Sequence, residues 1–260
     1  MTILKRLLFL SVVGAFSPVS AADLSGPVDV ALVLAVDVSS SMDRAELQLQ
    51  RSGYGAAISD PDVAQSLIGG PLHRIALIYV EWADPTKQVV TIDWQVIDSV
   101  AAAQAFAAQL ALKPLVSGTD TSISAALRFS ADQFDRLPVP ADRMIIDISG
   151  DGPNTAGPHV APVRDRIVAR GIVINGIPIE INAEPLDPAR GTTLADYYRD
   201  CVTGGPGAFV VTASTIRGMA DAIRRKLVLE VAGNSPGAEL VSVAASAPAD
   251  CTFGQKDFYE

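Results

Sequence analysis

The sequence predicts an α/β domain of the doubly wound class, in which helices cover both faces of a mostly parallel, six-stranded sheet. Two observations lead to this fold. Short apolar runs rich in valine and isoleucine are typical of strands buried on both faces. Most of these runs are separated by segments of helical length, and a helical crossover between neighbouring strands makes them parallel. With 49% hydrophobic residues among 260, the chain can bury a full core.

The first strand is expected at 28–37, where VDVALVLAVD is almost wholly apolar. The third run is different, because it follows a turn at Asp84-Pro85 and alternates apolar with polar residues, which favours an edge strand. This edge strand is expected at 87–94. The other strands are expected at 74–83, 143–150, 171–180 and 207–213.

The first helix is expected to start at Asp43, because Glu46 three positions later completes a capping-box pattern, and to end near Ile58. Further helices are expected at about 98–112, 122–134, 160–170, 192–201 and 214–229. After Ala232 the chain becomes rich in Ala, Ser, Pro and Gly, with a weak strand expected at 238–243.

The N-terminus has the pattern of a cleaved export signal. Lys5 and Arg6 precede an apolar run at 7–16, and small residues end at Ala21. This run is too short to span a bilayer, and no later segment is apolar enough to do so. We therefore expect a signal peptide at 1–21, a domain at 26–230, a tail at 231–260, and a periplasmic or secreted protein.

Charge and composition exclude several classes of function. Asp and Glu number 29 against 20 Lys and Arg, and this excess of acid argues against binding to nucleic acid or to an anionic membrane. The two histidines and two cysteines are not spaced as zinc ligands.

Oxygen-bearing side chains gather in three loops expected at the carboxyl edge of the sheet, where ligands bind in such folds. Asp37, Ser39 and Ser41 follow the first strand, Asp151 follows the fourth, and Thr119 precedes a helix. A helix-capping turn would also explain the serines. The set as a whole suits a hard divalent cation, Mg²⁺ above all, with Mn²⁺ or Ca²⁺ as alternatives.

The chain from about 28 to 229 resembles the von Willebrand factor A domain. The five residues resemble the metal-ion-dependent adhesion site of that domain. The resemblance implies the strand order 3-2-1-4-5-6 with the third strand antiparallel. It implies direct ligation by Ser39, Ser41 and Thr119, and ligation by Asp37 and Asp151 directly or through water. IYVEWA, ISGDGPN and DYYRDCVTGGPGAFV resemble a narrower group of exported bacterial A-domain-like proteins of unknown function.

The resemblance implies a protein-binding module for adhesion or scaffolding, in which a partner's Asp or Glu carboxylate fills an open position on the metal. Two alternatives stay open: a structural subunit whose metal only stabilises the fold, and a metal-dependent hydrolase. An enzyme is disfavoured, because Ser39 occupies the position of the second aspartate of phosphoryl-transfer sites, and no nucleophile-elbow or phosphate-loop motif is present.

Two further regions are candidates for partner binding. Glu81 and Trp82 precede the turn into the third strand, and the loop at 180–192 carries Glu184 and Arg190. The alternatives are that Trp82 packs against the sheet and that the loop is a solvated connection.

Cys201 and Cys251 allow one disulfide, which an exported protein can form. We expect the bridge at the end of the sheet opposite the metal site, because Cys201 would end a helix that runs away from that site. Two independent thiols are the alternative.

Overall fold

The computed structural model describes residues 25–181, 183–232 and 248–254. The expected signal peptide at 1–21 and the weak strand at 238–243 lie outside the described residues, so both stay predictions.

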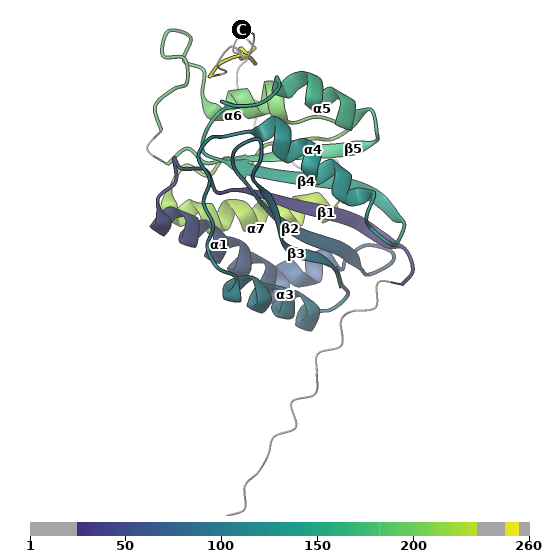
Figure 1. Ribbon diagram of the computed structural model, residues 1–260. Coiled ribbons are helices and arrows are strands. Elements are labelled where there is room, and N and C mark those ends of the chain that lie inside the picture. Colours follow the sequence, from purple (N-terminus) through teal and green to yellow (C-terminus); the bar gives the residue numbers. More distant parts are fainter. Residues whose placement is uncertain (1–24, 182, 233–247, 255–260) are drawn as a thin grey trace, which may run out of the picture.

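Five strands form one sheet in the order β3-β2-β1-β4-β5 (Figure 1). β1 is parallel to β2 and β4, β5 is parallel to β4, and β3 is antiparallel to β2. The doubly wound fold and the antiparallel third strand are therefore confirmed. The strands are β1 Val28–Asp37, β2 Ile75–Trp82, β3 Gln88–Ile97, β4 Ala141–Gly150 and β5 Ile172–Pro178.

The expected sixth strand is not a regular strand, although its residues lie beside β5. The Gly176 N–H donates to the carbonyl of Phe209 (3.1 Å), and the Val211 N–H donates to the carbonyl of Gly176 (3.0 Å). The next ladder bond would need an N–H from Pro178, which proline lacks. Pairing resumes only where the Ala213 N–H donates to the Pro178 carbonyl (3.0 Å). Among the described residues, the segment therefore forms two isolated parallel bridges, one with Gly176 of β5 and one with Ile179 just after it.

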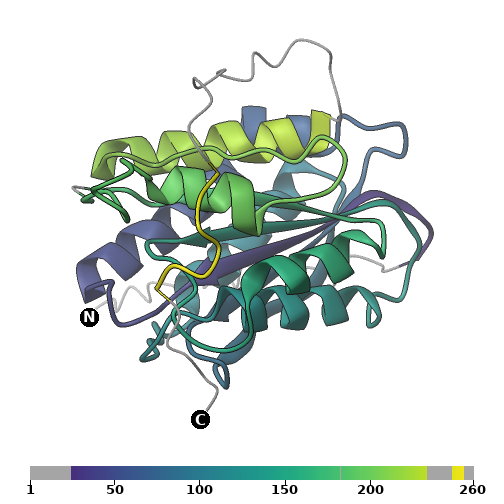
Figure 2. The ribbon, with the colours of Figure 1, turned by 90° about the horizontal axis from the view of Figure 1, so that it is seen from above.

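Helices cover both faces of the sheet (Figures 1 and 2). One layer contains α1, α2, α3 and α7, and the other contains α4, α5 and α6 with a π-helical turn, η1. From Val30 to Val36, successive side chains of β1 enter the two cores alternately, as the pleat of a strand requires. The helices are α1 Arg44–Ser59, α2 Pro61–Leu67, α3 Val100–Leu112, α4 Ile123–Phe134, α5 Val160–Val168, α6 Leu194–Tyr197, η1 Tyr198–Val202 and α7 Ile216–Ala232.

The start of α1 confirms the predicted capping box. The Asp43 carboxylate accepts bonds from the N–H groups of Ala45 (2.7 Å) and Glu46 (2.9 Å), and the Glu46 carboxylate accepts from the Asp43 N–H (2.9 Å). Each bond satisfies a group that the first turn of a helix leaves free.

Cys201 and Cys251 form a disulfide, but the bridge does not lie where we expected it. The expected helix at 192–201 is reduced to one α-turn and η1, which is too short to carry Cys201 to the far end of the sheet. The tail instead reaches the loop after β4, because a Cβ at Gly254 would lie 3.0 Å from the Pro153 side chain. That loop begins at Asp151, so the tail lies toward the predicted metal site.

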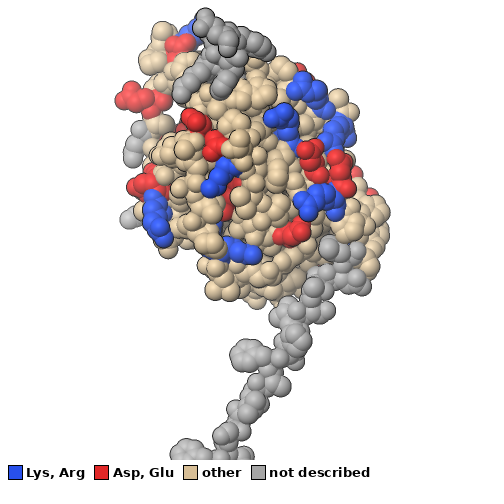
Figure 3. All heavy atoms as spheres, viewed as in Figure 1, with Lys and Arg blue, Asp and Glu red and all other residues tan. Residues whose placement is uncertain are grey.

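Charged side chains of both signs are interspersed on the face shown in Figure 3. No helix among the described residues is long and apolar enough to cross a membrane.

Candidate metal centre

The carboxyl ends of β1 and β4 bring the two predicted aspartates together. These strands are parallel neighbours, with Val36 opposite Ser149. Asp37 is the last residue of β1, and Asp151 follows the last residue of β4. The register therefore places both carboxylates at one edge of the sheet.

Asp37 is fully buried, and only one of its carboxylate oxygens has a protein partner. Oδ1 accepts a bond from the Ser39 N–H (2.7 Å), whereas Oδ2 accepts none from the residues that the structure describes. Gln50 fixes the backbone here by donating from Nε2 to the Asp37 carbonyl (2.8 Å). Burial, and secondarily the charge of Asp151, raise the pKa of Asp37 to about 8. Among the residues that the structure describes, no Lys or Arg side chain compensates the buried Asp37 carboxylate.

The two serines link the β1 end of the site to Asp151. The hydroxyls of Ser39 and Ser41 lie 3.0 Å apart, and the Ser41 hydroxyl donates to Asp151 Oδ1 (2.8 Å). Burial raises the pKa of Asp151, while the bond from Ser41 opposes this shift. Four of the five predicted ligands therefore form one connected cluster.

The fifth predicted ligand, Thr119, lies beside this cluster. The Gly118 N–H donates to the Val38 carbonyl (2.8 Å), and the Ser40 hydroxyl donates to the Thr119 carbonyl, so its loop is attached to the turn after β1. The Thr119 hydroxyl is exposed and faces Asp84 Oδ2 at 3.4 Å. We assigned no ligand role to Asp84 from the sequence, although its position just after β2 was a signal for one.

Large buried side chains surround the last residue of β4. A Cβ at Gly150 would lie 2.7 Å from Tyr198 Oη, 2.8 Å from Asp37 Oδ2 and 3.3 Å from Trp82 Cζ2. Tyr198 Oη and Trp82 Nε1 are, like Asp37 Oδ2, buried polar atoms that have no hydrogen-bond partner within 25–181, 183–232 and 248–254. Only glycine fits at this position without displacing Asp37.

Two of the four predicted partner-binding residues are not on the surface. Glu81 is 2% exposed, pairs with Arg51 and accepts a bond from the Thr91 hydroxyl (2.9 Å), and Trp82 is 0% exposed. The prediction of direct partner contact is wrong for both, because β2 is an inner strand and remains covered as far as Trp82. Packing of Trp82, the alternative, is confirmed.

The other two, Glu184 and Arg190, are exposed in the loop after β5, and Arg190 is paired with Asp187 at 3.5 Å. Their part in partner binding stays a prediction.

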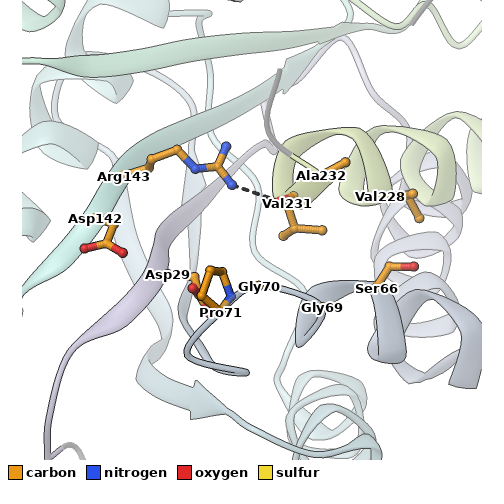
Figure 4. A pocket seen from close by; sticks show the side chains of 10 residues that line it. All are labelled: Asp29, Ser66, Gly69, Gly70, Pro71, Asp142, Arg143, Val228, Val231 and Ala232. Carbon is orange, nitrogen blue, oxygen red and sulfur yellow. Dashed lines mark hydrogen bonds between the residues drawn. The ribbon is translucent and has the colours of Figure 1, made fainter. Parts of the chain in front are cut away.

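The structure contains a cavity of about 180 Å³ next to the Ser41–Asp151 pair, which the sequence did not reveal. A larger cavity of about 550 Å³ lies at the opposite, amino-terminal edge of the sheet (Figure 4). Arg143 crosses this second cavity and donates to the Val231 carbonyl (2.9 Å). It contains none of the predicted ligands.

The residues at the carboxyl edge fit a hard divalent cation. Among the described residues no three His, Cys, Asp or Glu side chains gather as a metal-binding group, and the site offers two carboxylates with hydroxyls in place of a third. Hard cations accept such all-oxygen sets. The free oxygen of Asp37 is the buried polar atom that a cation would satisfy.

The fold is shared with solved structures at low sequence identity. The chain covers 31% of the pilus adhesin SpaC from Lactobacillus rhamnosus GG (TM-score 0.55, 13% identity, 82% of this chain). It covers 42% of a von Willebrand factor type A structure from Catenulispora acidiphila (TM-score 0.50, 14% identity, 77% of this chain).

A third similar structure is proximal thread matrix protein 1 from the mussel byssus, with a zinc-occupied MIDAS motif (TM-score 0.50, 16% identity, 79% of this chain and 47% of that one). The chain thus spans less than half the length of these proteins.

No curated protein matches the chain in sequence. A family model matches residues 27–235, which include every strand, the metal-site loops and α7. With a von Willebrand factor A-like fold, the chain therefore belongs to the family described as "Protein of unknown function (DUF1194)".

Proposed function

We propose that this chain is an exported protein-binding module that holds a partner's Asp or Glu carboxylate at a Mg²⁺-occupied site. The proposed ligands are Asp37, Ser39, Ser41, Thr119 and Asp151.

The observation that carries this proposal is the free oxygen of a buried aspartate. Asp37 Oδ2 is enclosed and has no hydrogen-bond partner in the described part of the chain, although a buried carboxylate is stable only when it is paired, protonated or bound to a metal. Asp151 raises its pKa further, so the pair is best compensated by a divalent cation.

The proposed ligands would have different roles at such a site. Asp37 and Asp151 supply negative charge from two neighbouring strands, and Ser39 and Ser41 add neutral oxygens between them. With only two carboxylates in the set, their charges would balance a bound divalent cation without exceeding it, so an open coordination position could still take a third carboxylate from outside. Thr119 would join after rotating its exposed hydroxyl away from Asp84.

The similar structures support a binding role. One is a pilus adhesin, one is a matrix protein of the mussel byssus, and the matrix protein holds zinc at its MIDAS motif. Since the chain spans less than half of each protein, their partners are not transferred to it. The expected signal peptide supports a periplasmic or secreted location, which N-terminal sequencing of the mature protein would test by finding Ala22 first.

Calorimetric titration with Mg²⁺ tests the site directly. We expect the purified protein to bind Mg²⁺ at millimolar concentration or tighter. Asp151→Ala should weaken binding about tenfold or more, because loss of even a group that only positions a metal ligand typically costs about 10–100-fold in affinity. Asp142→Ala is the matched control, because it removes an exposed carboxylate at the other end of the same strand. No Mg²⁺ binding by the wild type would refute the proposal.

Capture of a partner separates binding from a purely structural role of the metal. A pull-down from periplasmic extract should retain a partner in Mg²⁺ and lose it in EDTA, and Asp37→Ala should abolish capture. If chelation instead caused a large loss of thermal stability and no partner affected the protein, the structural alternative would hold. Metal-dependent turnover of a substrate would favour the hydrolase.

A further inference from the structure

The cavity of about 180 Å³ beside Ser41 and Asp151 has two unlike walls. Its polar wall consists of Ser41, Glu46 and Asp151. Its other wall is apolar and consists of Met42, Ile179, Ile181, Ala183 and Met219. The cavity therefore joins the proposed metal ligands to a small apolar surface.

The apolar wall is built from three separate parts of the fold. Met42 belongs to the turn after β1, Ile179 follows β5, and Met219 is on α7; all three are at most 5% exposed. The Ile179 N–H donates to the Gly150 carbonyl (2.9 Å), which fixes this wall next to Asp151. The packing of these side chains therefore determines the shape of this surface.

Size and charge restrict what this cavity accepts. It has room for about six water molecules at roughly 30 Å³ each. An aliphatic side chain that displaced them would gain from covering the apolar wall. Glu46 and Asp151 on the polar wall disfavour a second carboxylate.

We propose that the partner presents an aliphatic side chain directly next to its acidic residue, and that this side chain occupies the cavity. The inference rests on the proposed function, because the acidic residue must be bound at the cation. Ser41 and Asp151 belong to both the metal site and the cavity. The partner's carboxylate and its aliphatic side chain can therefore come from adjacent residues, which are spaced about 3.5 Å apart along an extended chain. The carboxylate is that of an Asp or Glu side chain inside the partner.

Two capped dipeptides test the proposal on the purified full-length protein in Mg²⁺. Acetyl-Asp-Leu-amide and acetyl-Asp-Gly-amide each carry one carboxylate, and NMR chemical-shift titration gives their dissociation constants. We expect the leucine peptide to bind about tenfold more tightly, since burying a leucine side chain is worth at least that factor. Equal affinities would overturn the inference.

A substitution at the rim of the cavity supplies the matched comparison. Ala183 is exposed and lines the cavity, so Ala183→Phe should narrow it without disturbing the core. The preference for leucine should then disappear, while affinities for Mg²⁺ and for the glycine peptide stay unchanged. Ala189→Phe, also at an exposed loop position but outside the cavity lining, should keep the preference. If Ala183→Phe also kept the preference for the leucine peptide, the cavity would not be the binding site of the leucine side chain.

The results separate this inference from the proposed function. If the wild type bound neither Mg²⁺ nor the glycine peptide, both would fail. If it bound both ligands but showed no preference for leucine, only the inference would fail. Tighter binding of N-acetyl-leucine than of the Asp-Leu peptide would overturn it as well, because the carboxylate would then be a chain terminus.

Discussion

Gly150 controls the space in which the Asp37 carboxylate lies. A methyl group there would approach Tyr198 Oη and Asp37 Oδ2 to less than 3 Å, and both side chains are fully buried. We expect Gly150→Ala to destabilise the protein by about 1–3 kcal/mol, as overpacking a core does, and to weaken Mg²⁺ binding. Urea denaturation and calorimetry measure the two effects.

Gly55→Ala is the control for this substitution. Gly55 is within α1, and nothing lies within 4 Å of the Cβ that it would gain. The substitution should raise stability by about 0.5–1 kcal/mol, because alanine favours a helix over glycine, and should leave Mg²⁺ affinity unchanged. If both variants lost stability and Mg²⁺ affinity to the same extent, crowding at Gly150 would not be the cause of the losses in Gly150→Ala.

Individual residues were predictable where strand ends determine their positions. Asp37 and Asp151 end neighbouring parallel strands, so the sequence was sufficient to bring them together. The direction of the Thr119 hydroxyl depends on Asp84, a tertiary neighbour that no local pattern reveals. Glu81 was misassigned because its buried partner, Arg51, is on α1, thirty positions away.

At the scale of elements, α7 is held to the sheet by a fully buried charge cluster. Lys226 pairs with Asp147 of β4 and, at 2.5 Å, with Glu230 one turn further along α7. Asn175 of β5 donates to Glu230 (3.3 Å), and the ammonium group of Lys226 lies 5.4 Å above the ring of Phe209. Two carboxylates thus share one ammonium group inside the core.

This cluster predicts a loss of stability with rising pH. Burial and the charge of Asp147 raise the pKa of Glu230 from 4.5 to about 7, so the folded protein binds more protons than the unfolded chain in this range. In EDTA, the stability that Glu230 contributes should therefore be present near pH 5 and be lost as the pH rises to about 7. Glu230 should contribute at most about 3 kcal/mol to this change in the free energy of unfolding. Urea denaturation from pH 5 to pH 8 measures it.

Glu230→Gln should reduce this pH dependence. Some should remain, because burial also raises the pKa values of Asp147, of Asp37 and of Asp151. Glu184→Gln, at an exposed position, should leave the profile as it is in the wild type. A stability that rose between pH 5 and pH 8 in the wild type would contradict this interpretation of the cluster.

Most elements followed from periodicity, and the exceptions have local causes. The prediction of a regular sixth strand was wrong, because Pro178 interrupts the hydrogen-bond ladder between β5 and this segment. No helix was expected between 58 and 74, where α2 lies, although the Asp60 carboxylate caps it and Pro61 is its first residue, an arrangement typical of helix starts. Its seven residues are too few for a helical period to be recognised.

At the scale of the molecule, the disulfide joins the tail to the domain across 50 positions. Closing a loop of this length stabilises a fold by about 4 kcal/mol through the unfolded chain's entropy. Cys251→Ser should therefore lower the free energy of unfolding by up to that amount, and reductant should do the same to the wild type. Urea denaturation with and without reductant tests both. Unchanged stability in the variant would mean that the bridge contributes nothing.

The interrupted ladder at Pro178 also bears on self-association. A sheet that ends in a long, regular strand offers free N–H and C=O groups to which another chain can add. Here one margin of the sheet ends in isolated bridges beside β5, and at the other margin the pairing of β3 with β2 shifts register twice. Neither margin is a straight template for a second molecule, so both irregularities protect the folded protein against edge-to-edge aggregation.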